Sequence, residues 1–192
     1  MKTIDTLAWL DILSAALKGV MCKIDGEESG LKTATENVQN ILAAAREREA
    51  SVYWVGNGGS CAICSHLSQD LINKLAIRSL FLNDSPLMTC MANDYGYEDV
   101  YARPLDTFAR EGDVLIAISS SGNSPNIMNA VDVARKKKMT LVTLSGFKPD
   151  NRLWNASASV SFMVPGTLYG IVEAAHEVIL HGIIETLWLD AQ

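Results

Sequence analysis

Two short loops rich in glycine and serine carry the residues best suited to chemistry in this 192-residue sequence. The segment GNGGS at residues 56–60 follows one apolar run, and SSSGNS at residues 119–124 follows another. Glycines let the backbone approach a ligand closely, and the unpaired amides at a helix start attract anions. For the first loop alone, a plain strand-to-helix turn is an equally good interpretation. The first loop also lacks the G-x-G-x-x-G spacing and the lysine of nucleotide-binding loops, so we expect no nucleotide cofactor.

The second loop offers three successive hydroxyl groups just before an expected helix. Ser124 and Pro125 are explained by helix capping alone, because serine is a good N-cap and proline suits the first helical turn. The three preceding serines, at residues 119–121, are not explained in that way. Their hydroxyls can donate to the oxygens of a phosphate group without any cation. Together the two loops therefore favour a small phosphorylated ligand.

Four further side chains are of types that transfer protons. His66 and Asp70 are four residues apart in an expected helix and share one face of it. Glu173 and His181 are eight residues apart in the last expected helix, about 80° apart around its axis. A carboxylate and an imidazole together supply a base and a proton carrier, and both pairs can border one pocket. By itself, His66 is better interpreted as a buried structural histidine, and we interpret His176 as a solvated or interface residue.

A parallel sheet is the element that would position these loops and pairs. Helical periodicity predicts a pair of helices over residues 5–23 and 28–48. From residue 51 onward, short apolar runs alternate with helical segments, which is typical of a parallel sheet covered on both faces. We expect strands at 52–55, 80–82, 114–118, 140–144 and 160–164, and helices at 60–75, 97–110, 125–137 and 168–189. In such a sheet both loops lie at the carboxyl edge, where ligands bind.

The composition is that of one ordinary globular domain, with 48% hydrophobic and 20% charged residues. Sixteen Lys and Arg against 22 Asp and Glu give a net charge of −6, and the chain has no basic stripe for a nucleic-acid partner. No stretch reaches the ~20 apolar residues of a membrane span, and the N-terminus has no secretion-signal pattern. We therefore expect a cytoplasmic protein with no membrane partner. Its four cysteines should be reduced, with the Cys61-x-x-Cys64 pair serving packing.

In their order and spacing, these motifs resemble those of the sugar isomerase (SIS) domain and, within it, the phosphoheptose isomerases. The resemblance spans essentially the whole chain and rests on GNGGS at 56–60 with His66, ANDYG at 92–96, EGDVL at 111–115, ISSSGNS at 118–124 and His181. It implies a single SIS domain over residues 1–192, a three-layer α/β/α sandwich with a central parallel sheet. Two N-terminal helices, residues 1–48, would precede the sugar-phosphate-binding core of residues 51–192. The family also implies a homotetramer in which these helices pack and the active sites lie at subunit interfaces.

The resemblance implies a reaction as well. Members of the family interconvert sedoheptulose 7-phosphate and D-glycero-D-manno-heptose 7-phosphate, through an enediol, on the route to the ADP-heptose of surface glycans. Asp70 would be the carbon base and His181 the acid or proton shuttle. The residues expected to bind the substrate are Asn57, Gly58, Ser60, Asn93, Asp94, Ser119, Ser120, Ser121, Ser124 and Glu173. Some members bind zinc at four positions that are here His66, Asp70, Glu173 and His181, so one Zn²⁺ per subunit is part of the hypothesis.

Three positions depart from the family pattern. Asp70 stands where the family has glutamate, Glu173 where it has glutamine and Gly170 where it has aspartate. The shorter Asp70 side chain would by itself reduce catalysis, whereas a carboxylate at Glu173 would strengthen cation binding. These departures leave open an isomerase of a different sugar phosphate. A second alternative is a non-catalytic SIS adaptor that binds a replication-initiator protein, although the intact serine loop argues against it.

Overall fold

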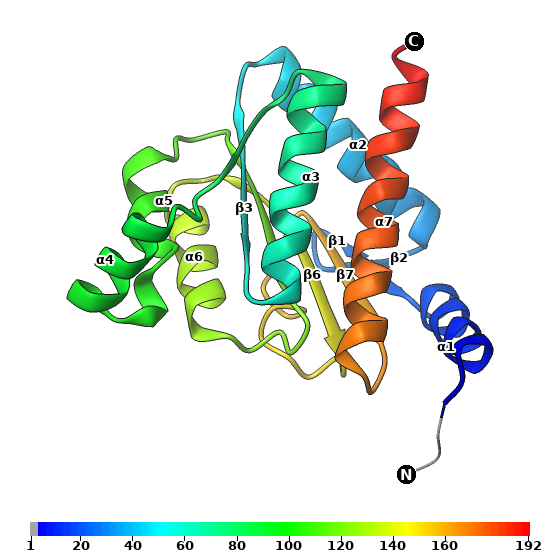
Figure 1. The fold of residues 1–192 in the computed structure, drawn as a ribbon. Helices are drawn as coiled ribbons and strands as arrows, with labels where there is room; N and C mark the ends of the chain where they lie inside the picture. Colours follow the sequence, from blue (N-terminus) through cyan, green and yellow to red (C-terminus); the bar gives the residue numbers. More distant parts are fainter. Residues whose placement is uncertain (1–3) are drawn as a thin grey trace.

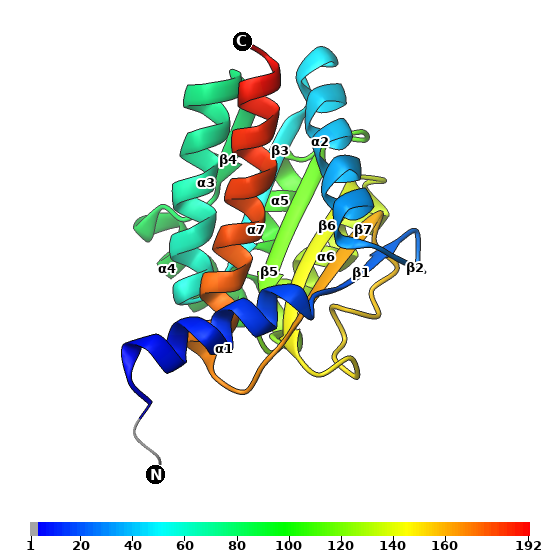
Figure 2. The same ribbon diagram turned by 90° about the vertical axis from the view of Figure 1, so that its right-hand side faces the viewer.

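The computed structural model describes residues 4–192, and in this range seven strands form one mixed sheet in the order β2-β1-β7-β6-β5-β3-β4 (Figure 1). The parallel strands are β3 (Ser51–Gly56), β4 (Arg78–Phe81), β5 (Val114–Ser119), β6 (Thr140–Phe147) and β7 (Val160–Pro165). The helices are α1 (Thr6–Lys18), α2 (Leu31–Glu47), α3 (Gly59–Leu75), α4 (Ser85–Tyr95), α5 (Ala102–Phe108), α6 (Pro125–Lys136) and α7 (Tyr169–Asp190), with a short 3-10 helix η1 (Tyr97–Asp99). Figure 2 shows α1, α2, α3 and α7 on one side of the sheet and α6 on the other. The predicted three-layer α/β/α sandwich with a central parallel sheet is confirmed.

The central strands are buried on both faces, as their apolar sequences predict. All six residues of β3 and of β5 are buried. Trp54 and Ile116 pack into the core beneath α2, α3 and α7, whereas Tyr53 and Leu115 pack into the second core beneath α5 and α6. Because successive side chains of a strand point to opposite faces, each strand contributes to both cores. The central strands therefore have little freedom to shift, which fixes the loops at their ends.

The strand order places the two glycine- and serine-rich loops side by side. β3 lies between β4 and β5, so the connections that leave β3 and β5 run in opposite directions along the sheet. The last residue of β3, Gly56, is the register partner of Ile118 near the end of β5. The crevice at such a reversal is where open α/β sheets bind ligands. Residues 57–60 and 120–124 thus meet at the edge where a ligand is expected.

The predicted N-terminal helical pair is only partly correct. The structure ends α1 at Lys18 and inserts a hairpin of β1 (Met21–Ile24) and β2 (Glu27–Ser29) before α2. The hairpin pairs antiparallel with β7 and widens the sheet. Asp25 and Gly26 both have positive φ, at 49° and 90°, as Asp-Gly turns of two-residue hairpins do. The Asp-Gly signal outweighed the helical periodicity; residues 1–3 of the predicted segment 1–48 lie outside the described residues.

The region before β5 also differs from the prediction of one helix over residues 97–110. The structure has η1 and the shorter helix α5 there, and it has α4 upstream, which the periodicity did not predict. No residue of α4 is fully buried, and its short apolar face, Met88, Met91 and Ala92, is only partly buried against the second core, so its helical signal in the sequence is weak. Gly96, with φ of 93°, ends α4 and separates it from η1. Among residues 4–192, every helix is too short or too polar to span a membrane.

Candidate functional site

The serine loop gathers hydroxyl groups at the start of α6. The hydroxyl of Ser119, the last residue of β5, donates to the Ser124 hydroxyl at 3.2 Å and lies 3.5 Å from that of Ser121. The Ser120 side chain is only 5% exposed, and its hydroxyl has no hydrogen-bond partner within residues 4–192. A buried hydroxyl without a partner is costly, and the oxygen of a bound anion is the kind of acceptor that removes the cost. The loop therefore has both the helix start and an unpaired hydroxyl that suit a phosphate group.

The shape of the serine loop depends on close packing against Asn151. Gly122 has φ of 65°, and a Cβ atom at this position would lie 2.0 Å from the Asn151 Oδ1 atom. Asn151 is itself held in place, because its side chain donates to the Lys148 carbonyl at 2.7 Å and accepts from the Trp154 amide at 2.8 Å. The Leu153 amide also donates to the Gly122 carbonyl. Only glycine fits at position 122 without moving the loop.

The loop between β3 and α3 has a different occupant at its helix start. The carboxylate of Glu173 rests against Gly59, the first residue of α3, where a Cβ atom would lie 2.4 Å from Oε2. The start of a helix carries partial positive charge, which a carboxylate neutralises. Ser60, also expected to bind the substrate, is 3% exposed in the first turn of α3. Glu173 thus places a negative charge beside the start of α3.

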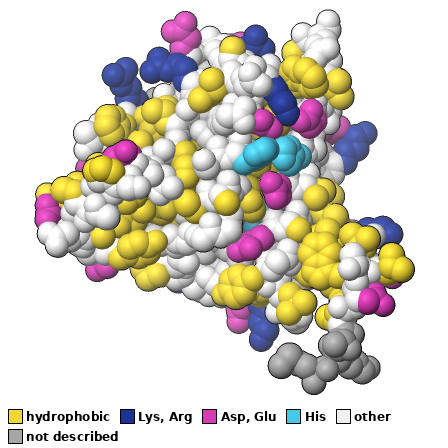
Figure 3. All heavy atoms as spheres, viewed as in Figure 1, with side chains coloured by type: hydrophobic (Ala, Val, Ile, Leu, Met, Phe, Trp, Pro, Cys, Tyr) yellow, Lys and Arg dark blue, Asp and Glu magenta, His cyan; other side chains and the backbone are white. Residues whose placement is uncertain are grey.

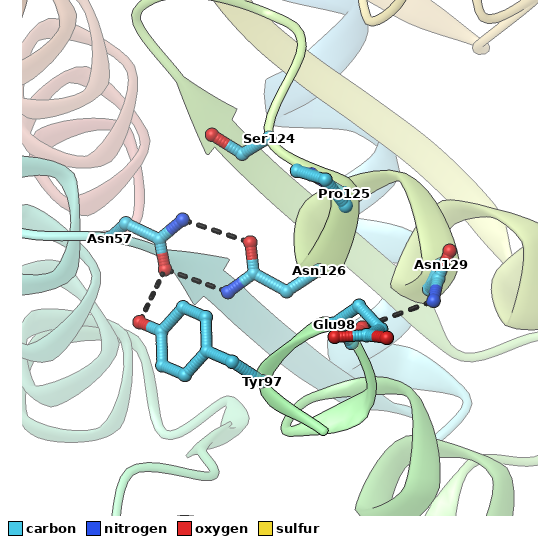
Figure 4. Close-up of a pocket in the computed structure, with 7 residues that line it drawn as sticks. All are labelled: Asn57, Tyr97, Glu98, Ser124, Pro125, Asn126 and Asn129. Atoms are coloured by element: carbon cyan, nitrogen blue, oxygen red, sulfur yellow. Dashed lines mark hydrogen bonds between the residues drawn. The ribbon is translucent and has the colours of Figure 1, made fainter. Parts of the chain in front are cut away.

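A cavity of 620 Å³ opens between the two loops and η1 (Figure 4). Its lining residues are Asn57, Tyr97, Glu98, Ser124, Pro125, Asn126 and Asn129. Asn57 and Ser124 were expected at a binding site from the sequence. Tyr97 and Asn126 were not, and both hydrogen-bond to Asn57. The sequence contains no local signal for these contacts, because 40 and 69 residues separate the partners.

Two histidines and a carboxylate meet where α3 and α7 lie side by side. The Asp70 Oδ2 atom is 3.9 Å from the His66 Nε2 atom and 3.8 Å from the His181 Nδ1 atom. The imidazole rings of His66 and His181 touch edge to face, with their centroids 5.2 Å apart. Figure 3 shows this pair as one histidine patch flanked by acidic side chains. The predicted proton-transfer pair, Asp70 and His181, is therefore assembled by the fold.

The same cluster has the ligand types of a metal site. One ligand atom each from His66, Asp70 and His181 lies within 4.8 Å of the other two. Imidazole nitrogens and a carboxylate oxygen suit a divalent ion such as Zn²⁺. Glu173, the fourth predicted ligand, is not part of this group, because its carboxylate lies at Gly59. The structure thus brings together three of the four predicted ligands.

Lys74 is a charged neighbour of this cluster that the sequence reasoning missed. Its ammonium group lies 3.1 Å from the Asp70 Oδ2 atom and also pairs with the Glu185 carboxylate. The carboxylates of Glu185 and Asp70 raise the pKa of Lys74, so it stays charged. The spacing of His66, Asp70 and Lys74, at i, i+4 and i+8, is the signal that points to it.

The other residues that the sequence singled out belong neither to the cavity lining nor to the histidine cluster. Asn93 and Asp94 lie on the exposed end of α4, where their side chains hydrogen-bond to each other at 2.8 Å. Gly58 caps the start of α3 with φ of 55°. Cys61 and Cys64 are free thiols whose pKa values are raised by burial, which agrees with a packing role.

The structure contradicts the interpretation of His176 as a solvated or interface residue. It is fully buried, and its Nε2 atom lies 2.9 Å from the Ser145 carbonyl oxygen. Its Nδ1 atom has no partner within residues 4–192, and burial lowers the pKa of the ring to about 4. The ring is therefore neutral at pH 7. The sequence reasoning failed here because a polar residue on α7 faces the sheet.

Known proteins resemble this chain in both sequence and fold. The family model of the SIS domain matches residues 18–146. The phosphoheptose isomerase of Fusobacterium nucleatum subsp. nucleatum is 33% identical over 164 residues, which cover 83% of this chain and 84% of that one. The phosphoheptose isomerase of Edwardsiella ictaluri is 34% identical over 155 residues, 78% of each chain. The solved structure of a phosphoheptose isomerase from Francisella tularensis covers all of both chains, with a TM-score of 0.83 at 22% identity.

Proposed function

This chain belongs to the SIS domain family and, within it, to the phosphoheptose isomerases, and from this premise we propose that it interconverts sedoheptulose 7-phosphate and D-glycero-D-manno-heptose 7-phosphate. The observation that carries the proposal is the contact between Asp70 on α3 and His181 on α7, at 3.8 Å. An aldose–ketose isomerisation needs a base for carbon and a carrier for the oxygen proton. A carboxylate and an imidazole at this distance can both reach adjacent atoms of one substrate.

The proton transfers balance when these two residues share them. From the ketose, Asp70 takes the proton on C1 while His181 gives a proton to the oxygen on C2, and the enediol forms. Asp70 then returns its proton to C2, while His181 takes the proton of the C1 hydroxyl. The C1 oxygen becomes the aldehyde, and both residues regain their starting states. No redox cofactor is needed, since hydrogen moves only within the substrate and these two side chains.

The serine loop is the proposed phosphate site. Its hydroxyls and the amides at the start of α6 are neutral donors, so they can hold one phosphate although the protein carries a net charge of −6. The unpaired buried hydroxyl of Ser120 supports this assignment.

His66, Asp70 and His181 fit a divalent ion, because imidazole and carboxylate are ordinary zinc ligands and their donor atoms already lie close together. When bound, such an ion would supply Lewis-acid polarisation of the substrate's carbonyl oxygen. Lys74 competes for the Asp70 carboxylate at this site. We propose one Zn²⁺ per subunit, with Glu173 as a fourth ligand only after its side chain leaves Gly59.

We further propose a cytoplasmic homotetramer, in which residues 1–48 pack between subunits and the active sites lie at subunit interfaces. One observation supports this assembly: α1 exposes Leu7 and Leu10, with 74% and 50% of their surface accessible. Apolar surface of this kind favours association. Supply of heptose phosphate for ADP-heptose and surface glycans is the proposed role.

A different sugar phosphate is the second candidate substrate. The observation that favours it is at Gly170, where a Cβ atom would meet no described atom within 4 Å. Within residues 4–192 the protein therefore has no side chain near a position where the family carries aspartate. The non-catalytic adaptor gains no support, because the curated relatives of this chain are named as isomerases.

Turnover by the purified protein tests the proposal directly. We expect ¹³C NMR to show conversion of sedoheptulose 7-phosphate to the heptose phosphate, with added zinc or with a chelator. As a matched control, Asn73→Asp changes an exposed residue of α3 and is expected to keep wild-type turnover. Absence of turnover under every metal condition would contradict the proposed function, and turnover of another sugar phosphate would favour the second candidate.

A further inference from the structure

Asn57, in the loop after β3, is held by a closed network of side-chain hydrogen bonds (Figure 4). Its Nδ2 atom donates to the Asn126 Oδ1 atom at 2.9 Å, and its Oδ1 atom accepts from the Asn126 Nδ2 atom at 2.8 Å. The Tyr97 hydroxyl donates to the same Asn57 Oδ1 atom at 3.2 Å. Asn126 is only 2% exposed, so it has little freedom to leave this pairing. The network ties the β3 loop to α6 and η1.

A backbone amide favours one direction for the bonds of this network. The Ile127 N–H, which can only donate, is shared between the Asn126 Oδ1 atom and the Ser124 carbonyl oxygen, each at 3.1 Å. An NH₂ group of Asn126 on that side would face another donor, so Asn126 presents its oxygen there and its NH₂ group on the other side. Asn57 must then turn its own NH₂ group toward the Asn126 oxygen, since two facing oxygens would repel. The Tyr97 hydroxyl is consequently a donor to Asn57, although a hydroxyl can play either role.

The hydrogen-bond inventory leaves Asn57 with one unused group. Both acceptor sites of its Oδ1 atom are occupied, by Tyr97 and Asn126. One of the two protons on Nδ2 is bound to Asn126, and the other has no partner within residues 4–192. In Figure 4 the Asn57 nitrogen points toward the side of the pocket where Ser124 lies. Asn57 can therefore offer a ligand one N–H donor and no acceptor.

We propose that Asn126 and Tyr97 are positioning residues that fix Asn57 as the donor of a single hydrogen bond to an oxygen atom of the bound sugar phosphate. The inference rests on the proposed function for the identity of the ligand, but its geometry does not. The site then selects an oxygen that can accept, such as that of a carbonyl, a hydroxyl or a phosphate. It disfavours an N–H or ammonium group at the same place, because a donor there would face another donor.

A double-mutant cycle in the full-length protein tests this inference. Asn126→Leu keeps the approximate size of the side chain but removes both of its hydrogen bonds to Asn57, and it adds no charge at the start of α6, where the phosphate is proposed to bind. We expect kcat/KM for sedoheptulose 7-phosphate to fall about tenfold, chiefly through KM, which corresponds to one lost hydrogen bond. Tyr97→Phe removes only one of the two bonds to the Asn57 oxygen, and about a threefold loss is expected. Asn57→Ala should cost at least as much as Asn126→Leu.

The decisive measurement is the effect of each change when Asn57 is already absent. If Asn126 and Tyr97 act through Asn57, adding either substitution to Asn57→Ala lowers kcat/KM no further. A merely structural role would instead give additive losses, and additivity overturns the inference. Tyr97 is 57% exposed, so Tyr97→Phe keeps the test decisive even if Asn126→Leu unfolds the protein.

The same experiment separates failure of this inference from failure of the proposed function. Additive losses in an active enzyme overturn the positioning role and leave the function in place. If the wild type binds sedoheptulose 7-phosphate in calorimetry without converting it, the function fails, and the cycle is run on the dissociation constants instead. If the wild type shows neither binding nor turnover, both are overturned.

Discussion

The loops after β3 and β5 are similar in sequence but differ in what lies at the helix start. At α3 the carboxylate of Glu173 lies beside Gly59, so the protein itself places a negative charge next to that helix start. At α6 the hydroxyls of Ser119, Ser121 and Ser124 gather, and Ser120 has an unpaired hydroxyl. The two helix starts therefore differ in charge although their sequences are similar. This difference favours the α6 loop as the proposed phosphate site.

We propose that this difference divides the site into two regions. Uncharged donors of the first region bind the phosphate, and charged side chains of the second region transfer protons. The binding region is the serine loop, whose donors are hydroxyls and amides. The reacting region is the contact of α3 with α7, where His66, Asp70, Lys74 and His181 meet. Changes in the reacting region should lower kcat, and changes in the serine loop should raise KM.

Asp70→Asn should have the largest effect on catalysis, and it should lower kcat without changing KM much. The amide keeps the shape of the side chain but cannot accept a proton from carbon, so kcat is expected to fall about 100- to 10,000-fold. KM should change little, because the phosphate is held at α6. Steady-state kinetics with sedoheptulose 7-phosphate measure both values. A large rise in KM with unchanged kcat would place Asp70 in the binding region instead.

His176 should make the free energy of unfolding depend on pH. It lies on α7 and binds the Ser145 carbonyl oxygen, and Ser145 is the register partner of Ser119. Burial lowers the pKa of His176 from 6.5 to about 4. Between these pH values the unfolded chain therefore binds a proton at His176 that the folded chain does not bind. Stability is therefore complete above pH 6.5 and is lost as the pH falls toward 4, by roughly 3 kcal/mol.

Urea unfolding at several pH values measures this dependence. The matched variant His176→Leu should lose the part of the slope between pH 6.5 and 5, a range in which ordinary carboxylates contribute little. An equal slope in the wild type and in the variant would show that another group carries it.

Gly122→Ala should damage the serine loop and leave the reacting region intact. The added Cβ would collide with Asn151, and φ of 65° disfavours any side chain. We expect a loss of about 1–3 kcal/mol in the free energy of unfolding, together with a raised KM. Gly112→Ala is the matched control, since Gly112 also has positive φ but meets no described atom within 4 Å. Equal losses in both variants would mean that contact with Asn151 contributes nothing.

Glu173→Gln should have the smallest effect and should make the two loops more alike. Without the carboxylate, the start of α3 becomes able to attract an anion. A charge at a helix start is worth about 0.3–1 kcal/mol, so the inhibition constant of inorganic phosphate should fall about two- to fivefold. Glu177→Gln, one turn further along α7, is the control. If both variants shift the constant equally, net charge rather than the α3 start is responsible.

Local sequence patterns predicted the central strands and the helix starts beside them, but not the hairpin of β1 and β2 or the helix α4. The apolar runs of β3 and β5 and the helix starts at Gly59 and Pro125 could be recognised because burial and capping act within a few residues. The hairpin at residues 21–29 was missed, although Asp25–Gly26 is a turn signal, because the flanking residues also fit a helix. α4 was missed because its few apolar side chains are only partly buried.

Residue types and spacing by themselves determined the sheet, the two loops, and the placement of His66 and Asp70 on one face of α3. Periodic burial and capping are local, so one sequence suffices to recognise them. Only the tertiary structure decided that Glu173 lies beside the start of α3, that Lys74 pairs with Glu185, that His181 meets Asp70, and that Asn126 orients Asn57. These contacts join residues that are far apart in the chain or on different helices. Such pairings depend on the packing of whole elements, which no local pattern encodes.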